Sequence, residues 1–227
     1  MMSDMNADRL AELEATLQTG ALNHRQAALK ELANAPSELA VPAFARLSTA
    51  PDFLCRRFAA TGLGNHITPA SLDVLKARMG QETDNNVLAE IANALFEFGE
   101  PAIPLLQAMF EEHDNWLIRQ TIISVVMESD ADQVLLGLIE RALVDNVWAV
   151  RETAILALGR TLRGPLQPEA MTLLSDLSES KVWRDRWRAA TALRLASDPR
   201  AKVLLAKLQQ DENHYVAAAA LESSLPS

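Results

Sequence analysis

The hydrophobic positions of this chain recur at helical spacing, in segments that share one pattern. A clear example is residues 145–159, with the sequence DNVWAVRETAILALG. Within it, Val150, Ala154 and Leu158 fall four residues apart and so share one face of a helix. Faces this rich in alanine let a second helix come close. The pattern therefore predicts short helices that bury a small-residue face against a neighbour.

The same pattern returns along the chain at a nearly constant interval. Taking Arg151 as the reference, the equivalent positions are Arg25, Arg56, Leu88, Arg119, Arg151, Arg186 and Ala217. Successive positions are 31 to 35 residues apart, and an insertion near residues 163–165 accounts for the longest step. A period of about 30 residues, with room for two helices per unit, is typical of stacked helical hairpins.

We therefore expect an all-α fold, a right-handed α-solenoid of about seven helical hairpins in one domain, residues 1–227. The expected units are approximately residues 6–35, 36–66, 67–99, 100–129, 130–163, 164–197 and 198–227. Pro69, Pro101 and Pro199 are expected to open the first helix of their hairpins, because proline fits the first helical turn. Asp84 and Asn115 are expected to cap the second helix.

The charge and composition of the chain disfavour some classes of binding partner. The formal net charge of −9 disfavours nucleic acid and anionic membranes, which would repel the chain. No apolar stretch approaches the roughly 20 residues of a membrane-spanning helix, and the acidic start lacks the apolar centre of a signal peptide. The single cysteine, Cys55, excludes an internal disulfide and fits a reducing compartment. We therefore expect a cytoplasmic protein without nucleic-acid partners or membrane insertion.

Arginine occupies most of the equivalent positions and forms what we call the arginine ladder: Arg25, Arg56, Arg119, Arg151 and Arg186. One interpretation is an anion-binding surface. We favour a structural interpretation, in which each arginine bonds an aspartate or backbone carbonyls of a neighbouring turn and ties one unit to the next. Leu88 replaces arginine in the third unit and would interrupt a continuous charged groove.

Aromatic residues stand three positions before the reference residue in several units: Phe53, Trp116, Trp148 and Trp183. This position lies in the first turn of the second helix of a hairpin. The rings either cover the turn of their own unit, which we favour, or form an aromatic ridge for a partner. Tryptophan is a frequent interface anchor, and truncating such an anchor costs about 2 kcal/mol or more of binding.

The helical phase places a second group opposite the core, on the concave side of the expected solenoid: Arg57, Phe58, Arg160, Trp187 and Arg188. Two neighbouring pairs in this group join an aromatic ring to an arginine. A bilin with two propionates would need that combination of stacking and carboxylate pairing. A protein partner would use it too, and we favour the protein partner.

Few residues of the chain are candidates for catalysis or for metal binding. Cys55 falls at a core position, so we interpret it as a buried small residue rather than a nucleophile or a bilin-accepting thiol. His24, His66, His113 and His214 lie in different units, without the spacing of metal ligands. The chain also lacks a phosphate-binding loop, a nucleophile elbow and a paired-carboxylate motif. We expect no metal site and no conventional catalytic residue.

Several segments resemble known repeat proteins. The motif V-R-x-x-A-x-x-A-L-G at residues 150–159, with proline-opened helices elsewhere in the repeat, resembles HEAT-like repeats. Residues 56–75, residues 115–130 and the C-terminal stretch that begins WRDRWRAATALRL resemble the cyanobacterial phycobilin lyase-related (CpcE/NblB) group. The short, single-module length is most similar to the NblB type.

This resemblance implies a binding platform that contacts a phycobiliprotein, phycocyanin or allophycocyanin, and assists phycobilisome disassembly or chromophore release. One alternative is a bilin lyase subunit that holds phycocyanobilin on its concave face. Another is a general assembly scaffold unrelated to bilin. The platform would require no cofactor, and lyase activity is implied by the resemblance alone. The sequence leaves the oligomeric state open.

Overall fold

The structure, a computed structural model, describes residues 6–222. These residues form fourteen α-helices and one short 3-10 helix, with no strand, as the all-α prediction requires. The helices are α1 (Ala7–Thr19), α2 (Leu22–Ala33), α3 (Ser37–Leu47), α4 (Phe53–Gly64), α5 (Pro69–Met79), α6 (Asn85–Phe96), η1 (Glu100–Ala102), α7 (Ile103–Glu112), α8 (Trp116–Val126), α9 (Asp132–Ala142), α10 (Trp148–Thr161), α11 (Gln167–Ser178), α12 (Trp183–Leu193), α13 (Pro199–Leu208) and α14 (His214–Leu221). Each successive pair of α-helices lies inside one of the residue ranges expected for a repeat unit.

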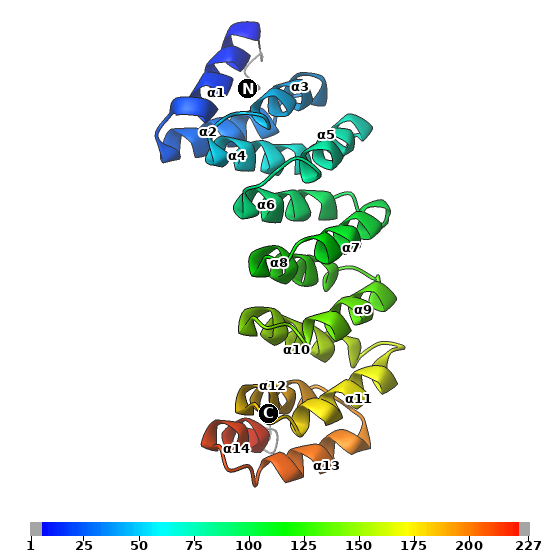
Figure 1. Ribbon diagram of the computed structural model, residues 1–227. Coiled ribbons are helices and arrows are strands. Elements are labelled where there is room, and N and C mark those ends of the chain that lie inside the picture. Colours follow the sequence, from blue (N-terminus) through cyan, green and yellow to red (C-terminus); the bar gives the residue numbers. More distant parts are fainter. Residues whose placement is uncertain (1–5, 223–227) are drawn as a thin grey trace. The chain divides into compact units, whose positions relative to one another are not determined.

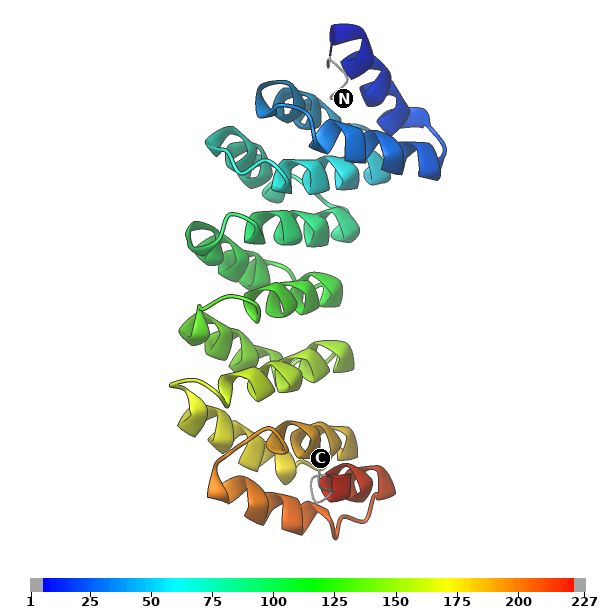
Figure 2. The same cartoon turned by 180° about the vertical axis from the view of Figure 1, so that it is seen from behind.

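The chain divides into two compact units, Met1–Ile122 and Ile123–Ser227, with α8 spanning the division. In the first unit, α3, α5 and α7 line one side and α4 and α6 the other (Figure 1). In the second, α9, α11 and α13 face one way and α10, α12 and α14 the other, and the reverse view agrees (Figure 2). The hairpin arrangement is therefore present in each unit, while a single continuous domain stays a prediction.

The helices begin at residues whose chemistry favours a helix start. The Asp84 carboxylate accepts hydrogen bonds from the first N–H groups of α6, and the Asn115 side chain accepts one from the first turn of α8. Pro69 and Pro199 are the first residues of α5 and α13, as expected. Pro101 instead lies in η1, so this proline opens the short 3-10 turn that leads into α7 rather than α7 itself.

In the second helix of the hairpins, the face that is buried in the core is the one that the helical spacing predicted. Val150, Ala154 and Leu158 of α10 are fully buried. Glycine is needed where these helices approach most closely: a Cβ at Gly64 would lie 2.9 Å from the Cα of Ala94 in α6. Small residues on the apolar face thus permit the short helix-to-helix distance that the sequence pattern predicted.

Within residues 6–222, no helix combines the length and the apolar character that crossing a membrane would require.

Candidate functional site

The arginine ladder is a set of turn-to-turn ties, and Arg56 shows the geometry best. Its Nε and Nη2 donate to the carboxylate of Glu82 at 2.7 and 3.0 Å. Its Nη1 donates to the backbone carbonyls of Ala50 and Pro51 at 3.0 and 2.9 Å. One guanidinium on α4 therefore joins the turn that precedes α4 to the turn that precedes α6.

Two other members repeat this geometry. Arg186 of α12 donates to both carboxylate oxygens of Asp211, at 2.6 and 2.8 Å, and to the Ser180 carbonyl at 2.8 Å. Arg25 of α2 pairs with Asp52 and donates to the Gly20 carbonyl at 2.8 Å. The structural interpretation of the ladder is confirmed at these positions.

The remaining positions differ in detail. Arg151 donates to the Asp145 carbonyl at 2.6 Å and lies 3.8 Å from Asp185, a buried carboxylate in the next hairpin. Arg119 reaches Asp114 of its own turn at 3.4 Å. Leu88, which replaces arginine in the third unit, is buried, so the ladder is interrupted there as expected.

The buried ion pairs set the acidity of their carboxylates. Burial disfavours the ionised form of Glu82, but hydrogen bonds from Arg56 and from the backbone N–H groups of Asp84 and Thr83 outweigh it, so its pKa lies below the usual value. Bonding to Arg186 likewise lowers the pKa of Asp211. These arginines are committed to holding the fold, which leaves them unsuited to binding a ligand anion.

The residues expected on the concave side are divided between the two compact units. In the first unit, Arg57 is exposed and its Nε donates to Glu90 at 2.9 Å, while Phe58 beside it is half-buried. The Thr61 hydroxyl donates to the same glutamate at 2.9 Å. Arg57 thus has a partner on the neighbouring helix α6.

The second unit holds the other three. Arg160 donates to Asp132 at 2.6 Å and to the Ser129 carbonyl. Arg188 pairs with Glu152, and its guanidinium carbon lies 4.0 Å from the centre of the Trp187 ring. Within this unit the structure brings Trp187 and Arg188 together as an aromatic–arginine pair on the side of α10 and α12.

The four aromatic residues at the start of the second helices have different exposures. Phe53 and Trp116 are each 45% exposed, whereas Trp148 and Trp183 are half-buried. Trp148 has the Arg151 guanidinium above its ring at 5.4 Å. An aromatic ridge that engages a partner stays a prediction.

The structure adds a cluster that the sequence had not indicated, which we call the Trp183 cluster: Trp183, Arg184, Trp187, Arg188, His214 and Tyr215. The Trp183 ring stacks on Tyr215 at 5.6 Å and lies 6.4 Å from Trp187. The Arg184 guanidinium lies 4.9 Å above the Trp183 ring. Two signals could have revealed it: the four-residue spacing of the tryptophans on α12, and the one-period spacing that brings the first turn of α14 beside that of α12.

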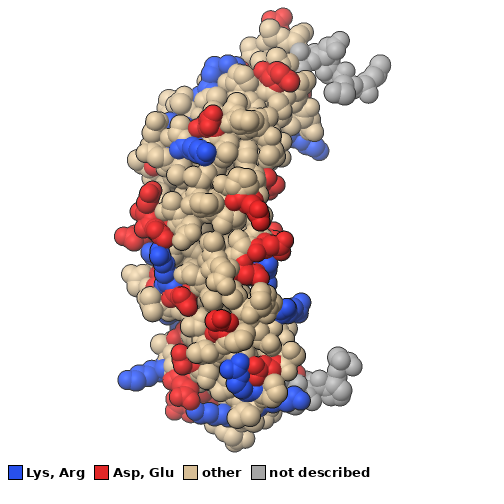
Figure 3. Space-filling model, turned by 90° about the vertical axis from the view of Figure 1, so that its right-hand side faces the viewer, with Lys and Arg blue, Asp and Glu red and all other residues tan. Residues whose placement is uncertain are grey.

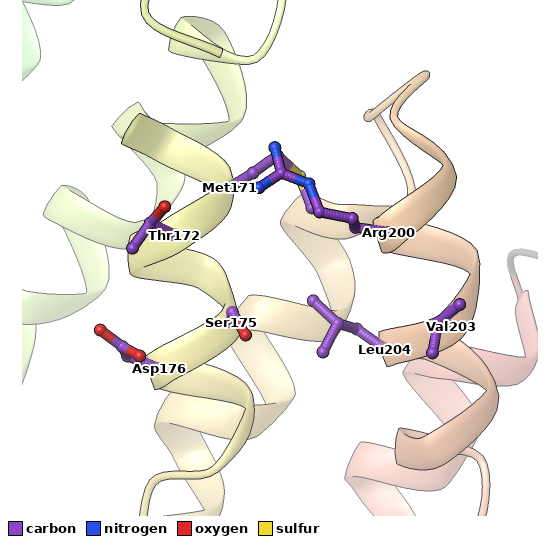
Figure 4. Close-up of a pocket in the computed structure, with 7 residues that line it drawn as sticks. All are labelled: Met171, Thr172, Ser175, Asp176, Arg200, Val203 and Leu204. Carbon is purple, nitrogen blue, oxygen red and sulfur yellow. The ribbon is translucent and has the colours of Figure 1, made fainter. Parts of the chain in front are cut away.

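A second feature missed from sequence is a hollow of about 380 Å³ between α11 and α13 (Figure 4). Leu204 and Ser175 point into it from opposite walls, and Arg200 extends across one end toward Met171 (Figure 4). In the space-filling view, acidic and basic side chains lie scattered among neutral ones (Figure 3). The charged residues in the lining of the hollow are Asp176 and Arg200, and Arg200 is paired with Asp198 at 2.8 Å.

Reactive and metal-binding groups are sparse in the described part of the chain. Cys55 is completely buried, as predicted, and burial raises the pKa of its thiol. Residues 6–222 contain no group of three or more histidine, cysteine, aspartate or glutamate side chains placed to hold a metal ion.

Several solved structures share this fold. The complex of CpcE and CpcF of phycocyanin lyase from Nostoc sp. PCC7120 is 18% identical with a TM-score of 0.51, and the match covers 98% of this chain and 91% of that chain. The archaeal HEAT-like repeats protein from Thermococcus onnurineus NA1 is 15% identical with a TM-score of 0.57, covering 98% and 97%. The karyopherin Kap121p, bound to the extreme C-terminus of the phosphatase Cdc14p, is 15% identical with a TM-score of 0.56, covering 97% and 29%. At these identities the likeness concerns the fold alone.

No curated protein matches the sequence. The family model for HEAT repeats matches three overlapping stretches, residues 10–95, 44–127 and 81–159. Together they span most of the chain, in agreement with the repeated hairpins and with the folds of the solved structures. The chain therefore belongs to the HEAT-repeat family.

Proposed function

We propose that this chain is a binding platform for a phycobiliprotein, phycocyanin or allophycocyanin, and that it assists phycobilisome disassembly or chromophore release in the manner of the NblB type. The observation that carries the proposal is the pair Trp187 and Arg188 on the side of α10 and α12. Tryptophan and arginine are both enriched among the residues that dominate interface binding energy.

Two further observations support a protein partner over chemistry on a small substrate. The arginines of the ladder are bonded within the fold, and the one cysteine is buried. HEAT repeats expose the long faces of their helices, which suits a large partner surface. The likeness to the CpcE–CpcF complex supports a phycobiliprotein as that partner, and the NblB-type role rests on the sequence resemblance.

We expect the chain to co-migrate with purified phycocyanin or allophycocyanin in size-exclusion chromatography. Trp187→Ala should weaken this association roughly tenfold or more, because truncating a tryptophan that anchors an interface costs about 2 kcal/mol or more. Val144→Ala is the control, since it truncates an apolar side chain that is 84% exposed in the same compact unit and lies outside the candidate binding groups. Equal loss in both variants would place the contact elsewhere, and no co-migration with either phycobiliprotein would contradict the proposal.

A bilin lyase subunit is the second candidate, favoured by the same CpcE–CpcF likeness and by the arginine beside Trp187. Bilin would stack on the indole, and one of its propionates would take the place of Glu152 as the partner of Arg188. In this case mixing the chain with free phycocyanobilin should change the absorbance spectrum of the pigment, and Trp187→Ala should abolish the change. An unchanged spectrum with the unaltered chain would rule this candidate out.

A general assembly scaffold is the third candidate. The shared fold of Kap121p, solved with the C-terminus of another protein bound, is compatible with such a role. It would be favoured by failure of both experiments above, because neither a phycobiliprotein nor bilin would then be a ligand.

A further inference from the structure

Arg184 differs from the arginines of the ladder in having no acidic partner. Its side chain is exposed at the start of α12, and it makes no side-chain hydrogen bond or ion pair with any residue between 6 and 222. What holds it is an aromatic ring: the guanidinium carbon lies 4.9 Å from the centre of Trp183. A cation over a ring keeps its N–H groups free to donate to an outside acceptor.

The ring that holds Arg184 is itself fixed from a second helix. Trp183 of α12 stacks on Tyr215 of α14 at 5.6 Å, with 23° between the ring planes. Figure 1 and Figure 2 both show α12 and α14 side by side. The guanidinium is therefore positioned before any ligand arrives, which lowers the entropy lost on binding.

Among the described residues, a second unpaired cation and two exposed apolar side chains lie near Arg184, while the exposed Glu212 of the turn before α14 lies 3.7 Å from Arg186. Lys181 is exposed one turn earlier and also has no carboxylate partner in the described part of the chain. Val182 is 42% exposed and Tyr215 is 55% exposed. We call Lys181, Val182, Trp183, Arg184 and Tyr215 the Arg184 surface. It offers unneutralised positive charge in a chain whose net charge is −9.

We propose that the Arg184 surface binds an acidic segment of a protein partner, with a carboxylate on the Arg184 guanidinium and an adjacent apolar side chain against Tyr215. The planar guanidinium fork matches a carboxylate in a bidentate geometry. Nucleic acid and anionic membranes also carry negative charge, but the net negative charge of this chain repels such large negative surfaces. The inference rests on the proposed function in taking the partner to be a protein, and it adds the chemistry of the partner's segment.

The test uses a synthetic probe, so that its outcome is independent of phycobiliproteins. The probe is a short fluorescein-labelled peptide of alternating glutamate and leucine, and its control carries glutamine in place of glutamate. Anisotropy titration against the full chain should show saturable binding of the glutamate peptide, weakening as salt is added. The glutamine peptide should bind at least about tenfold more weakly.

Variants locate the site. Arg184→Gln should weaken binding of the glutamate peptide about tenfold, and Arg184→Lys should restore only part of it because lysine lacks the fork. Arg163→Gln is the matched control: Arg163 is also exposed, in the same compact unit, and lacks a carboxylate partner among the described residues. It should leave affinity within about twofold.

Several outcomes would overturn the proposal. They are equal binding of the two peptides, equal effects of the Arg184 and Arg163 variants, or no binding of the glutamate peptide at millimolar concentration. Self-association of the chain that Arg184→Gln abolishes would also overturn it, by making the occupant a second copy. If the peptide binds while phycobiliproteins do not, the acidic-segment inference stands and the proposed partner falls.

Discussion

Arg56→Ala is expected to lower the free energy of unfolding by about 3 kcal/mol, the lower end of the range for a broken buried ion pair. The variant removes the guanidinium that bonds the Glu82 carboxylate, which is 2% exposed, and leaves it only the longer pair with Arg78 at 3.9 Å. Glu82 keeps hydrogen bonds from the backbone N–H groups of Thr83 and Asp84, which is why the upper end of the range is not expected. Urea denaturation followed by circular dichroism measures the change.

The neighbouring arginine provides the control for this prediction. Arg57→Ala removes a pair with Glu90 in which the arginine side chain is 48% exposed, and pairs of that kind contribute about 0–1 kcal/mol. Replacing Arg56 and Glu82 together by methionine should cost less than Arg56→Ala alone, because the buried Glu82 charge is removed with its main partner, while Arg78, 3.9 Å from Glu82, keeps its hydrogen bond to Gln81. Equal effects of Arg56→Ala and Arg57→Ala would show that an arginine of the ladder contributes no more to stability than an exposed ion pair does.

The same pair predicts how stability depends on pH. The pKa of Glu82 in the folded chain lies below its usual value of about 4.5, so ionised Glu82 stabilises the fold. This contribution is complete above pH 4.5 and is lost as the pH falls through the lowered pKa. Glu82→Gln should therefore unfold with a weaker pH dependence in that acidic range, measured by the same denaturation at several pH values.

Gly62→Ala is expected to lower the free energy of unfolding by about 1–3 kcal/mol, despite the higher helix propensity of alanine. A Cβ at Gly62 in α4 would lie 2.2 to 2.5 Å from three ring atoms of Phe44 in α3. Phe44 is completely buried, so its ring cannot move aside without disturbing the core. Thermal or urea denaturation gives the magnitude.

Two comparisons separate this clash from a general effect of the substitution. Gly137→Ala, in α9, meets nothing within 4 Å and should stabilise by about 0.5–1 kcal/mol. In a Phe44→Leu background, Gly62→Ala should cost less than in the unaltered chain, because the smaller side chain leaves room for the methyl group. A Gly62→Ala variant as stable as the unaltered chain would contradict the close approach of α3 and α4.

Periodicity alone predicted most of the fold. Positions such as Val150, Ala154 and Leu158 repeat at one period, and any sequence with that pattern buries the same face. The ladder was predictable for a related reason: Arg56 and Arg186 occupy one register, so one geometry serves both. Pro101 was predicted less well because proline fits the first turn of a 3-10 helix as readily as that of an α-helix.

The candidate site was predicted only in part, because its contacts depend on distances between helices. The sequence put Trp187 and Arg188 on an exposed side, but the pairing of Arg188 with Glu152 required the position of α10 relative to α12. The stacking of Trp183 on Tyr215 likewise depends on how α14 docks. Asp185 shows more clearly what the sequence pattern does not predict. It occupies a position at which the pattern requires an apolar residue, and its carboxylate is nevertheless buried beside Arg151.

Tyr215 is the only tyrosine in the chain, and it lies against Trp183 of the preceding hairpin. An excited tyrosine transfers its energy efficiently to a tryptophan at such a short separation, so its own emission is silent while the two rings stay stacked. Tyr215 is therefore an intrinsic fluorescent probe of the last hairpin. Tyrosine fluorescence should appear when α14 separates from α12, and no label has to be added.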